Sequence, residues 1–391
     1  MATGAGARWE AHAGAWRDPA QVVAHWADAS AVDPAQLRYH TAGPWWDLLA
    51  ELDVCLLVSR EYEHLLLALT GRPSATRQTF MPLPHPSGIA FDERNGVVHV
   101  ASTRNPNQLV SLLPVCEAVA RDDAAPPKLT HRPLVPVTTA YYPGSLYLHD
   151  LALVGGRLHG NAVGWNAVVR LHPDGRFRPV WWPGTVERDG RPDFGRNYLQ
   201  LNSIAAGSTL RSSFFSASAA RPSARRPGHR NFPVDGRGVV FSGRTGEPVV
   251  RGLTRPHSAR LHEGVLWVLN SGYGEVGRGR DGRFEPAARL HGWTRGLCFL
   301  GDYAFVGTSR VIPRFRQYAP GLEVARSTCG VHALDVGTGQ VVASLWWPEG
   351  NQIFAVEALP RAFTGGLPFS APRRRGRDRD LFYSFTTRGG V

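Results

Sequence analysis

Histidine, asparagine and arginine open several short apolar segments that recur along this chain of 391 residues. Two of them, His149 and His257, could act as general acid and general base, because imidazole titrates near neutral pH. A third, Arg295, could hold an anionic group of a substrate with its guanidinium. We therefore predict these three residues as the catalytic residues of a polar site. The first residues of all six segments are Ser87, His149, Asn202, His257, Arg295 and Ala355.

Other polar residues lie close to these positions and extend the predicted site. His85 and Gln200 stand two residues before Ser87 and Asn202, and further polar residues follow the second apolar run of several repeats. Convergent polar side chains at one mouth of a channel are typical of a ligand site. They also occur where ordered water ties a fold together. The predicted substrate-binding residues are His85, Asp150, Asn202, Asn270, Tyr273 and Arg310.

A divalent metal is a second use for part of this set, because His149, Asp150 and His257 are suitable ligand types. The sequence contains no HxH or HExxH motif, so no cofactor is firmly implied. It also lacks a P-loop, a GxSxG elbow, and a GxGxxG run followed by a helix. The reaction therefore stays open at this level, and so does the question of whether the protein is an enzyme.

The elements that position these residues are repeats of short β-strands. Each of the six segments is an apolar strand, and all but the last are followed by a turn and a second strand, as in 257–261 and 265–269. The segments recur at intervals of about 40 to 60 residues, which is typical of a β-propeller. We expect an all-β protein with six blades, in which the six first residues surround one mouth of a central channel.

Closure of the ring is predicted from an unpaired hairpin near the N-terminus. Residues 54–69 form two strands without an inner strand before them, and the sixth inner strand, 353–359, has no partners after it. Pairing these two segments would leave no open sheet edge. A seventh blade remains an alternative, because the strand 381–385 has no assigned place.

Three regions are expected along the chain. Residues 1–43 form a helical N-terminal extension, in which Asp18-Pro19 and Asp33-Pro34 each supply a helix cap followed by proline. Residues 44–360 form the propeller, and residues 361–391 form an arginine-rich C-terminal segment that is partly extended. Long insertions such as 309–328 lie on the faces of the ring, where binding sites are usually built.

Composition and charge restrict the binding partners and the cellular compartment that we expect. The formal charge is +12, but the arginines are scattered, and the dense runs 221–230 and 373–379 lie in expected loops. We expect no sequence-specific nucleic-acid binding. The four cysteines form no CxxC pair, and no apolar leader or membrane-spanning run is present. The interpretation is a cytoplasmic monomer that does not enter a membrane.

The sequence resembles a family of bacterial conserved hypothetical proteins, domain of unknown function 4915, from about Trp46 to Pro360. The resemblance implies a β-propeller without an established activity. This chain departs from the family pattern at Gln200-Leu201-Asn202-Ser203, where the family looks like His-Leu-Asn-Gly, and at Ala355, where the family tends to an acidic residue. The resemblance rests on Leu148-His149-Asp150-Leu151-Ala152, Pro256-His257-Ser258, Leu266-Trp267-Val268-Leu269, Thr294-Arg295-Gly296-Leu297, Phe305-Val306-Gly307, Cys329-Gly330-Val331 and Ile353-Phe354.

Two functions of different classes fit these observations. In the first, the channel mouth binds a small polar or anionic molecule and transforms it in a lyase, isomerase or hydrolase reaction. In the second, the protein is a non-catalytic scaffold that binds a protein partner through its arginine-rich face loops. The first requires a ligand at His149, His257 and Arg295, whereas the second requires only water there.

Overall fold

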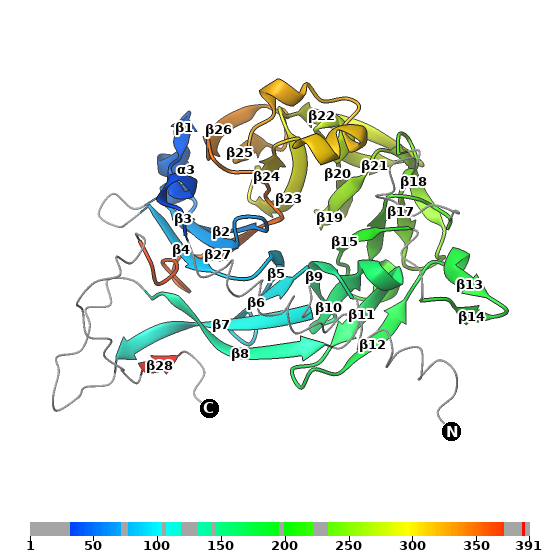
Figure 1. Cartoon of the computed structure of the whole chain (residues 1–391), viewed down its shortest axis with the longest axis horizontal. Coiled ribbons are helices and arrows are strands. Elements are labelled where there is room, and N and C mark those ends of the chain that lie inside the picture. The colour runs from blue at the N-terminus through cyan, green and yellow to red at the C-terminus, as the bar shows by residue number, and fades with distance from the viewer. Residues whose placement is uncertain are drawn as a thin grey trace.

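A computed structural model describes residues 32–71, 77–103, 107–118, 132–142, 146–194, 199–222, 234–370 and 385–387. Antiparallel sheets follow one another around a central axis and form a six-bladed β-propeller (Figure 1). In each blade one inner strand lies at the channel and the outermost strand lies at the rim (Figure 1). The predicted fold class and the six predicted inner strands are confirmed.

The first three blades contain the following strands, from the channel outward. The first blade has β27 (Ala355–Pro360), β2 (Val54–Arg60), β3 (Leu65–Thr70) and β4 (Gln78–Pro82). The second has β5 (Pro86–Asp92), β6 (Val97–Ser102), β7 (Asn107–Ala118) and β8 (Leu134–Tyr142). The third has β9 (Leu148–Val154), β10 (Arg157–Ala162), β11 (Ala167–Leu171) and β12 (Phe177–Trp181).

The other three blades follow the same order. The fourth has β15 (Leu201–Ala205), β16 (Phe214–Ala217), β17 (Gly238–Ser242) and β18 (Pro248–Leu253). The fifth has β19 (Pro256–His262), β20 (Val265–Asn270), β21 (Glu275–Arg280) and β22 (Arg283–Arg289). The sixth has β23 (Trp293–Leu300), β24 (Tyr303–Ser309), β25 (Gly330–Asp335) and β26 (Val341–Trp346), with β1 (His40–Ala42) at its outer edge.

Short elements connect and decorate the blades. A two-stranded ribbon, β13 (Glu187–Arg188) and β14 (Arg191–Pro192), follows the third blade. One α-helix, α3 (Trp45–Glu51), precedes β2. The single-turn 3-10 helices are η1 (Pro34–Leu37), η2 (Val163–Trp165), η3 (Gly184–Val186), η4 (Leu210–Ser212), η5 (Ser271–Tyr273) and η7 (Val324–Arg326), and η6 (Pro313–Tyr318) is longer.

The two ends of the propeller close the ring in one sheet, as the sequence predicted. β27 pairs antiparallel with β2 over six consecutive positions, from Val54 opposite Pro360 to Ser59 opposite Ala355. The hydroxyl of Ser59 accepts from Ala355 N at 2.9 Å and donates to Ser87 O at 2.6 Å, which also ties the closing blade to the second one. Of the strand 381–385 considered for a seventh blade, only Phe385 is among the described residues, and it begins β28 (Phe385–Thr387), which pairs with the C-terminal end of β7.

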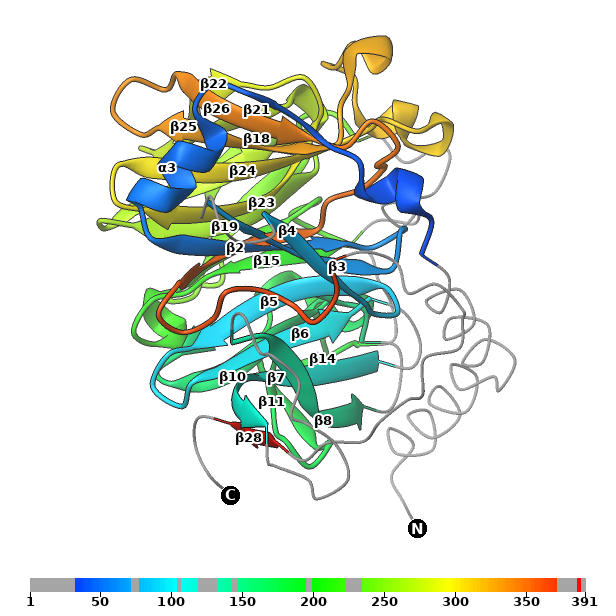
Figure 2. The same ribbon diagram turned by 90° about the vertical axis from the view of Figure 1, so that its left-hand side faces the viewer.

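The N-terminal part of the described chain seals the seam between the first and sixth blades. Trp45 and Leu49 of α3 are buried in one cluster with β2, β3 and β25, and Figure 2 shows α3 along the outer side of these blades. Asp33 caps η1 by accepting from Ala35 N at 2.8 Å, as expected. Residues 40–42 form a strand instead of a helix, because β1 pairs with β26. The helix predicted near Asp18 and the C-terminal segment beyond 370, except β28, lie outside the described residues.

A repeated backbone kink brings side chains to the channel mouth. His85, Tyr147, Gln200 and Arg255 all have positive φ, between 43° and 54°, and each stands two residues before the first residue predicted for an inner strand. The inner strands crowd together just beyond this kink. At Gly296, φ is +85°, and an added Cβ would lie 2.9 Å from Val356 N in the neighbouring inner strand, so glycine is required there.

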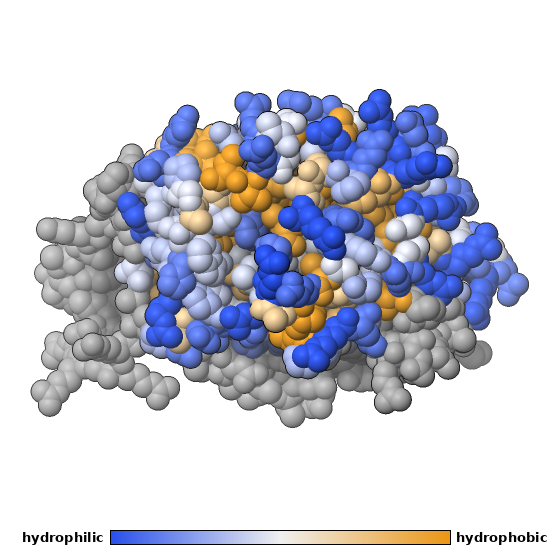
Figure 3. All heavy atoms as spheres, turned by 90° about the horizontal axis from the view of Figure 1, so that it is seen from above, coloured by the Kyte–Doolittle hydropathy of each residue, from blue (hydrophilic) through white to orange (hydrophobic). Residues whose placement is uncertain are grey.

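The outer surface is mixed in character. Seen from above in Figure 3, hydrophilic side chains alternate with smaller hydrophobic patches over the rim. In the described part of the chain, no helix is long and apolar enough to cross a membrane. Much of the two arginine-rich runs, at 223–230 and 373–379, falls outside the described residues.

Candidate functional site

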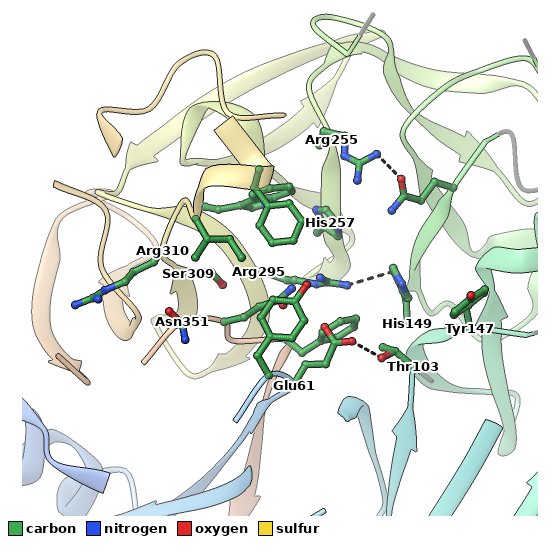
Figure 4. Close-up of a pocket in the computed structure, with 17 residues that line it drawn as sticks. Glu61, Thr103, Tyr147, His149, Arg255, His257, Arg295, Ser309, Arg310 and Asn351 are labelled. Atoms are coloured by element: carbon green, nitrogen blue, oxygen red, sulfur yellow. Dashed lines mark hydrogen bonds between the residues drawn. The ribbon is translucent and has the colours of Figure 1, made fainter. Parts of the chain in front are cut away.

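A cavity of about 160 Å³ opens at the channel mouth that the sequence pointed to (Figure 4). Its lining includes the three predicted catalytic residues, His149, His257 and Arg295, which come from the third, fifth and sixth blades. The volume is below the roughly 300–1,000 Å³ that is usual for drug-sized ligands, so a ligand that fits is small. The other lining residues come from the β2–β3 turn, the end of β6, the kinks before inner strands, and the segments around β24 and before β27.

Arg295 lies at the centre of this cavity and is held from three sides. Its Nη2 donates to His149 Nδ1 at 3.2 Å, and its guanidinium lies 3.2 Å from the ring centroid of Phe354. With the amide of Gln352 oriented to satisfy its neighbours, Nη1 donates to Gln352 Oε1 at 2.9 Å. Burial lowers the pKa of Arg295 to about 9, so the group is still a cation at neutral pH.

The hydrogen bonds of the two histidines imply opposite tautomers. Arg295 can only donate, so His149 accepts at Nδ1 and carries its proton at Nε2. Ser271 donates its hydroxyl to Thr294 O at 2.7 Å, so it accepts from His257 Nδ1 at 2.9 Å and leaves His257 Nε2 without a proton. One ring is therefore a donor and the other an acceptor at Nε2, the arrangement needed for an acid and a base.

His257 is neutral because of its surroundings. Only 2% of the residue is exposed, and burial followed by the charges of Arg295 and Arg255 lowers its pKa well below the ordinary 6.5. An anion placed between the two arginines would offset their charges. The basicity of His257 would then rise when such a ligand binds.

Arg255 is the second buried cation of the cavity and was not among the predicted residues. It donates to Gln200 Oε1 through Nη1, and its guanidinium lies 4.6 Å from the ring centroid of Tyr318. Its Nε is buried without a hydrogen-bond partner. Burial lowers the pKa of Arg255 to about 10, which leaves it charged at neutral pH.

Neither buried arginine forms a direct ion pair with a carboxylate within the described part of the chain, although Glu61 raises the pKa of Arg295 from the far side of Gln352, against the larger effect of burial. All ion pairs found there involve other basic residues, and Arg255 and Arg295 are in none of them. Both residues are at least nine-tenths buried, at 5% and 7% exposure. A buried charge without an ionic partner is unfavourable, so an anion bound beside these two arginines would stabilise them.

Glu61 supplies the one acidic side chain of the lining. It accepts from the Thr103 hydroxyl, and Gln352 Nε2 donates to its Oε2 at 3.1 Å. Gln352 thus joins Glu61 to Arg295 as a neutral bridge. Its side chain holds the carboxylate and the guanidinium in the same polar network.

Aromatic rings form another part of the wall. Tyr62 of the β2–β3 turn stacks on Phe315 of η6, with ring centroids 6.4 Å apart and planes 10° apart. Phe315 also packs edge to face on Trp293, at 5.2 Å. The insertion 309–328, expected to lie on a face, thus supplies part of the cavity wall.

The remaining predicted site residues do not line the cavity, except Arg310. Arg310 lies at the exposed rim and donates through Nη2 to Pro348 O. Asn202 donates to Ser218 Oγ at 3.1 Å and to Pro256 O at 2.9 Å, which joins the fourth and fifth blades. Asn270 accepts from Thr254 N at 2.7 Å and donates to Glu275 Oε2 at 2.8 Å.

His85, Tyr273 and Asp150 also point to structural partners. His85 lies against His64, with ring centroids 4.3 Å apart, and its Nδ1 is 3.8 Å from Glu61 Oε1. Tyr273 donates from its hydroxyl to Asp235 at 3.0 Å. Asp150 pairs with Arg260, which donates to both of its carboxylate oxygens, at 2.7 and 3.0 Å.

The predicted metal ligands do not form a cluster. The carboxylate of Asp150 is occupied by Arg260, and two cations stand beside His257. Among the residues that the structure describes, no group of three His, Cys, Asp or Glu side chains could hold a metal ion. The side chains present at the cavity therefore fit an anion better than a divalent cation.

A positional rule would have found several of the residues that the sequence interpretation missed. Tyr147, Arg255 and Trp293 line the cavity and stand two residues before His149, His257 and Arg295. The same offset had singled out Gln200, which also lines the cavity. By contrast, Glu61 and Gln352 lie in connections outside the repeat, and no spacing marks them.

Several solved structures are similar to this chain at low sequence identity. A chain of a nidogen/laminin complex matches with a TM-score of 0.50 and 11% identity, over 78% of this chain and 98% of that one. A protein of unknown function from Bacteroides caccae matches with 0.47 and 10%, over 78% and 98%. A gluconolactonase from Xanthomonas campestris matches with 0.42 and 15%, over 68% and 77%. The first of these likenesses concerns the fold alone.

Sequence comparison gives a closer placement. No curated protein sequence matches the chain. The model of the family named domain of unknown function 4915 matches residues 43–365, which include every blade and every residue that lines the cavity. The chain therefore belongs to the domain of unknown function 4915 family.

Proposed function

We propose that the cavity binds a small organic anion and that His149 and His257 move a proton on it. One observation carries this proposal: Arg255 and Arg295 are both buried beside the cavity, and among the described residues neither forms a direct ion pair with a carboxylate. A bound carboxylate would supply the missing negative charge. The charge of the site thus favours an anion over a neutral sugar or a cation.

The proton chemistry follows from the tautomers. His257 Nε2 is free of a proton and accepts one from the ligand, whereas His149 holds a proton at Nε2 that it can donate. Arg295 stands beside His149 and stabilises negative charge that develops on the ligand. A removed proton and a delivered proton on one molecule describe an isomerase or a lyase.

A covalent mechanism finds less support among the lining residues. The hydroxyl of Ser309 donates to Ile353 O at 3.2 Å and accepts from Ile353 N at 3.0 Å, so its hydrogen-bonding positions are used by the backbone. The cysteines of the described chain lie outside the lining. Proton transfer by the histidine pair therefore remains the chemistry that the cavity supports best.

Binding and proton transfer can be tested separately. The protein is titrated calorimetrically with a panel of small carboxylates and hydroxy acids at constant ionic strength. Exchange of ligand C–H for deuterium in D₂O is then followed by NMR. We expect at least one acid to bind and exchange, and His257→Gln to keep binding but lose about 100-fold or more of the exchange rate.

The matched control is His262→Gln, because His262 stacks on Phe299 at 4.3 Å and lies outside the lining. This variant should bind and exchange like the parent. If no acid binds more tightly than chloride, the proposal is wrong. A partner protein that co-purifies with this chain while the cavity holds no ligand would favour the scaffold function instead. Binding without exchange would retain the anion site and remove the enzymatic part.

A further inference from the structure

We infer that the natural ligand carries two separate acidic groups, in the manner of a short dicarboxylate. One group is held at Arg255 and the other at Arg295, with the reacting atoms near His257. This inference rests on the proposed anion site and adds the class of ligand. Three independent features of the cavity lead to it.

The first feature is that the two guanidiniums are mounted separately. Arg255 is held by Gln200 and Tyr318, whereas Arg295 is held by His149, Gln352 and Phe354, so they share no partner. Figure 4 shows His257 between them. Two cations fixed on different supports favour two anionic groups over one group that draws both arginines together.

The second feature is the charge of the lining. Three arginines and one glutamate line the cavity, and the histidine between Arg255 and Arg295 is neutral. The lining therefore has two more positive than negative groups. The charge of Arg255 also lowers the pKa of Arg295, after the larger effects of burial and Glu61, so the two cations disfavour each other. A monoanion offsets half of this excess, and a dianion offsets all of it.

The third feature is a pair of buried donors without partners at the Arg255 end. Arg255 Nε and Trp293 Nε1 both lack a hydrogen-bond acceptor, and both residues line the cavity. Tyr318 packs on both, since its ring centroid lies 4.6 Å from the Arg255 guanidinium and 6.1 Å from that of Trp293. An acidic group that reached these two donors would accept from a cation and an indole N–H together. The Arg255 end is thus equipped for an oxygen-rich group of its own.

The test compares ligands that differ only in the second acidic group. Malonate, succinate, glutarate and adipate are titrated calorimetrically against acetate, propionate, butyrate and pentanoate, with inorganic phosphate as a single-group dianion. We expect one dicarboxylate to bind at least 10-fold more tightly than its matched monocarboxylate and than phosphate. The chain length that binds best measures the spacing of the two guanidiniums.

Two variants assign the groups to the arginines. Arg255→Gln should lower the affinity of the best dicarboxylate by about 10- to 100-fold and leave the affinity for the matched monocarboxylate within about 2-fold. Glutamine is compatible with the backbone there, because Gln200 occupies the equivalent kink with φ 50°. Arg255→Lys should retain part of the preference, since it keeps the charge and loses the fork.

Arg278→Gln is the matched control, because Arg278 also stacks on a ring, 4.7 Å from the centroid of Trp267, but lies outside the cavity. It should change neither affinity. Equal binding of mono- and dicarboxylates, or tightest binding of phosphate, would overturn the two-group inference and leave the anion site standing. Equal losses for both ligand classes in Arg255→Gln, with an unchanged melting temperature, would also overturn it. If no anion in the series binds, both proposals fail.

Discussion

His149 Nδ1 accepts a hydrogen bond from Arg295 Nη2 at 3.2 Å, although the two residues lie 146 positions apart in the sequence. They belong to the third and sixth blades, which face each other across the ring of six blades (Figure 1). This contact fixes the tautomer of His149 and one edge of the Arg295 guanidinium at once. The site consequently depends on the closure of the whole ring, since no single blade contains both groups.

The first prediction concerns the shape of the Arg295 side chain. Arg295→Lys keeps a positive charge but cannot donate to His149 and Gln352 from two ends of one plane. We expect the affinity for the best-binding carboxylate to fall about 10-fold or more, with little change in the melting temperature. Calorimetry checks the first quantity and thermal unfolding the second. An unchanged affinity would show that Arg295 acts only as a distant charge.

The second prediction concerns Asp150, which the sequence suggested as a ligand residue. Its carboxylate accepts from Ile204 N at 3.0 Å and Leu151 N at 3.1 Å, besides the two bonds from Arg260. Asp150→Ala leaves the partly buried cation of Arg260 and two buried backbone N–H groups without their partner. We expect a loss of about 3–5 kcal/mol in the free energy of unfolding.

Urea denaturation measures this loss, and Asp174→Ala is the control. Asp174 pairs with Arg176 at 2.6 Å on the surface, so its removal should change stability little. Similar effects of the two substitutions would contradict a structural role for Asp150. Asp150→Ala combined with Arg260→Met should recover part of the stability, because the unpaired charge is then removed as well.

The sequence was sufficient to predict the ring because strand spacing is a local pattern. The inner strands from Ser87 to Ala355 and the closure of β2 on β27 followed from repetition alone. The same repetition placed His149, His257 and Arg295 at one mouth of the channel. Position in a repeat thus predicts where the backbone of a residue lies.

Position in a repeat does not predict which partners the polar group of a side chain contacts. Asp150 follows His149 directly, yet its carboxylate turns to Arg260, which is 110 residues away. Arg255 stands at the same offset from its strand as His85 and Gln200, and it was overlooked because that offset was not followed around the whole ring. Its importance comes from its burial without a direct ion pair among the described residues. Glu61 and Gln352 lie in connections, where chain geometry has no period to detect. Contacts between blades decide these cases, and the sequence does not list them.

The third prediction concerns acid stability and His332 of β25. Its Nδ1 is 2.8 Å from Ser344 Oγ and its Nε2 is 3.0 Å from Thr308 Oγ1, and burial lowers its pKa to about 4. Between pH 6.5 and 4 the unfolded chain binds a proton at this residue that the folded chain does not. The contribution of neutral His332 to the free energy of unfolding is therefore complete above pH 6.5. It is lost as the pH falls toward 4, by at most about 1.4 kcal/mol per pH unit.

The comparison of wild type with His332→Gln isolates this effect. Glu357 has the opposite sign, because burial raises its pKa to about 7 and the folded state then binds the extra proton. The pH dependence of the free energy of unfolding of the wild type contains the effects of both groups. The difference between the wild type and His332→Gln contains the effect of His332 alone. We expect the variant to lose less stability between pH 6.5 and 4. Parallel profiles over this range would show that His332 titrates normally in the folded state.

The last prediction joins ring closure to the site. A chain that ends at Phe354 lacks β27, so β2 loses its inner partner and Ser59 loses the bond from Ala355 N. Val356 is also removed from the cluster that joins the first and sixth blades, and Leu359 from the cluster that joins the first and second blades. We expect a broad thermal transition, and we expect carboxylate binding to disappear even though every residue that lines the cavity is still present.

A chain that ends at residue 370 is the matched control, since it keeps β27 and removes only later residues, including β28. It should melt sharply and bind carboxylate like the full chain, because Arg295 then still meets His149 across a closed ring. If the chain that ends at Phe354 melts as sharply as this control, the seam is not what makes the ring cooperative. If it melts broadly but still binds, the third and sixth blades reach each other without closure, and the site is more local than the contact between His149 and Arg295 implies.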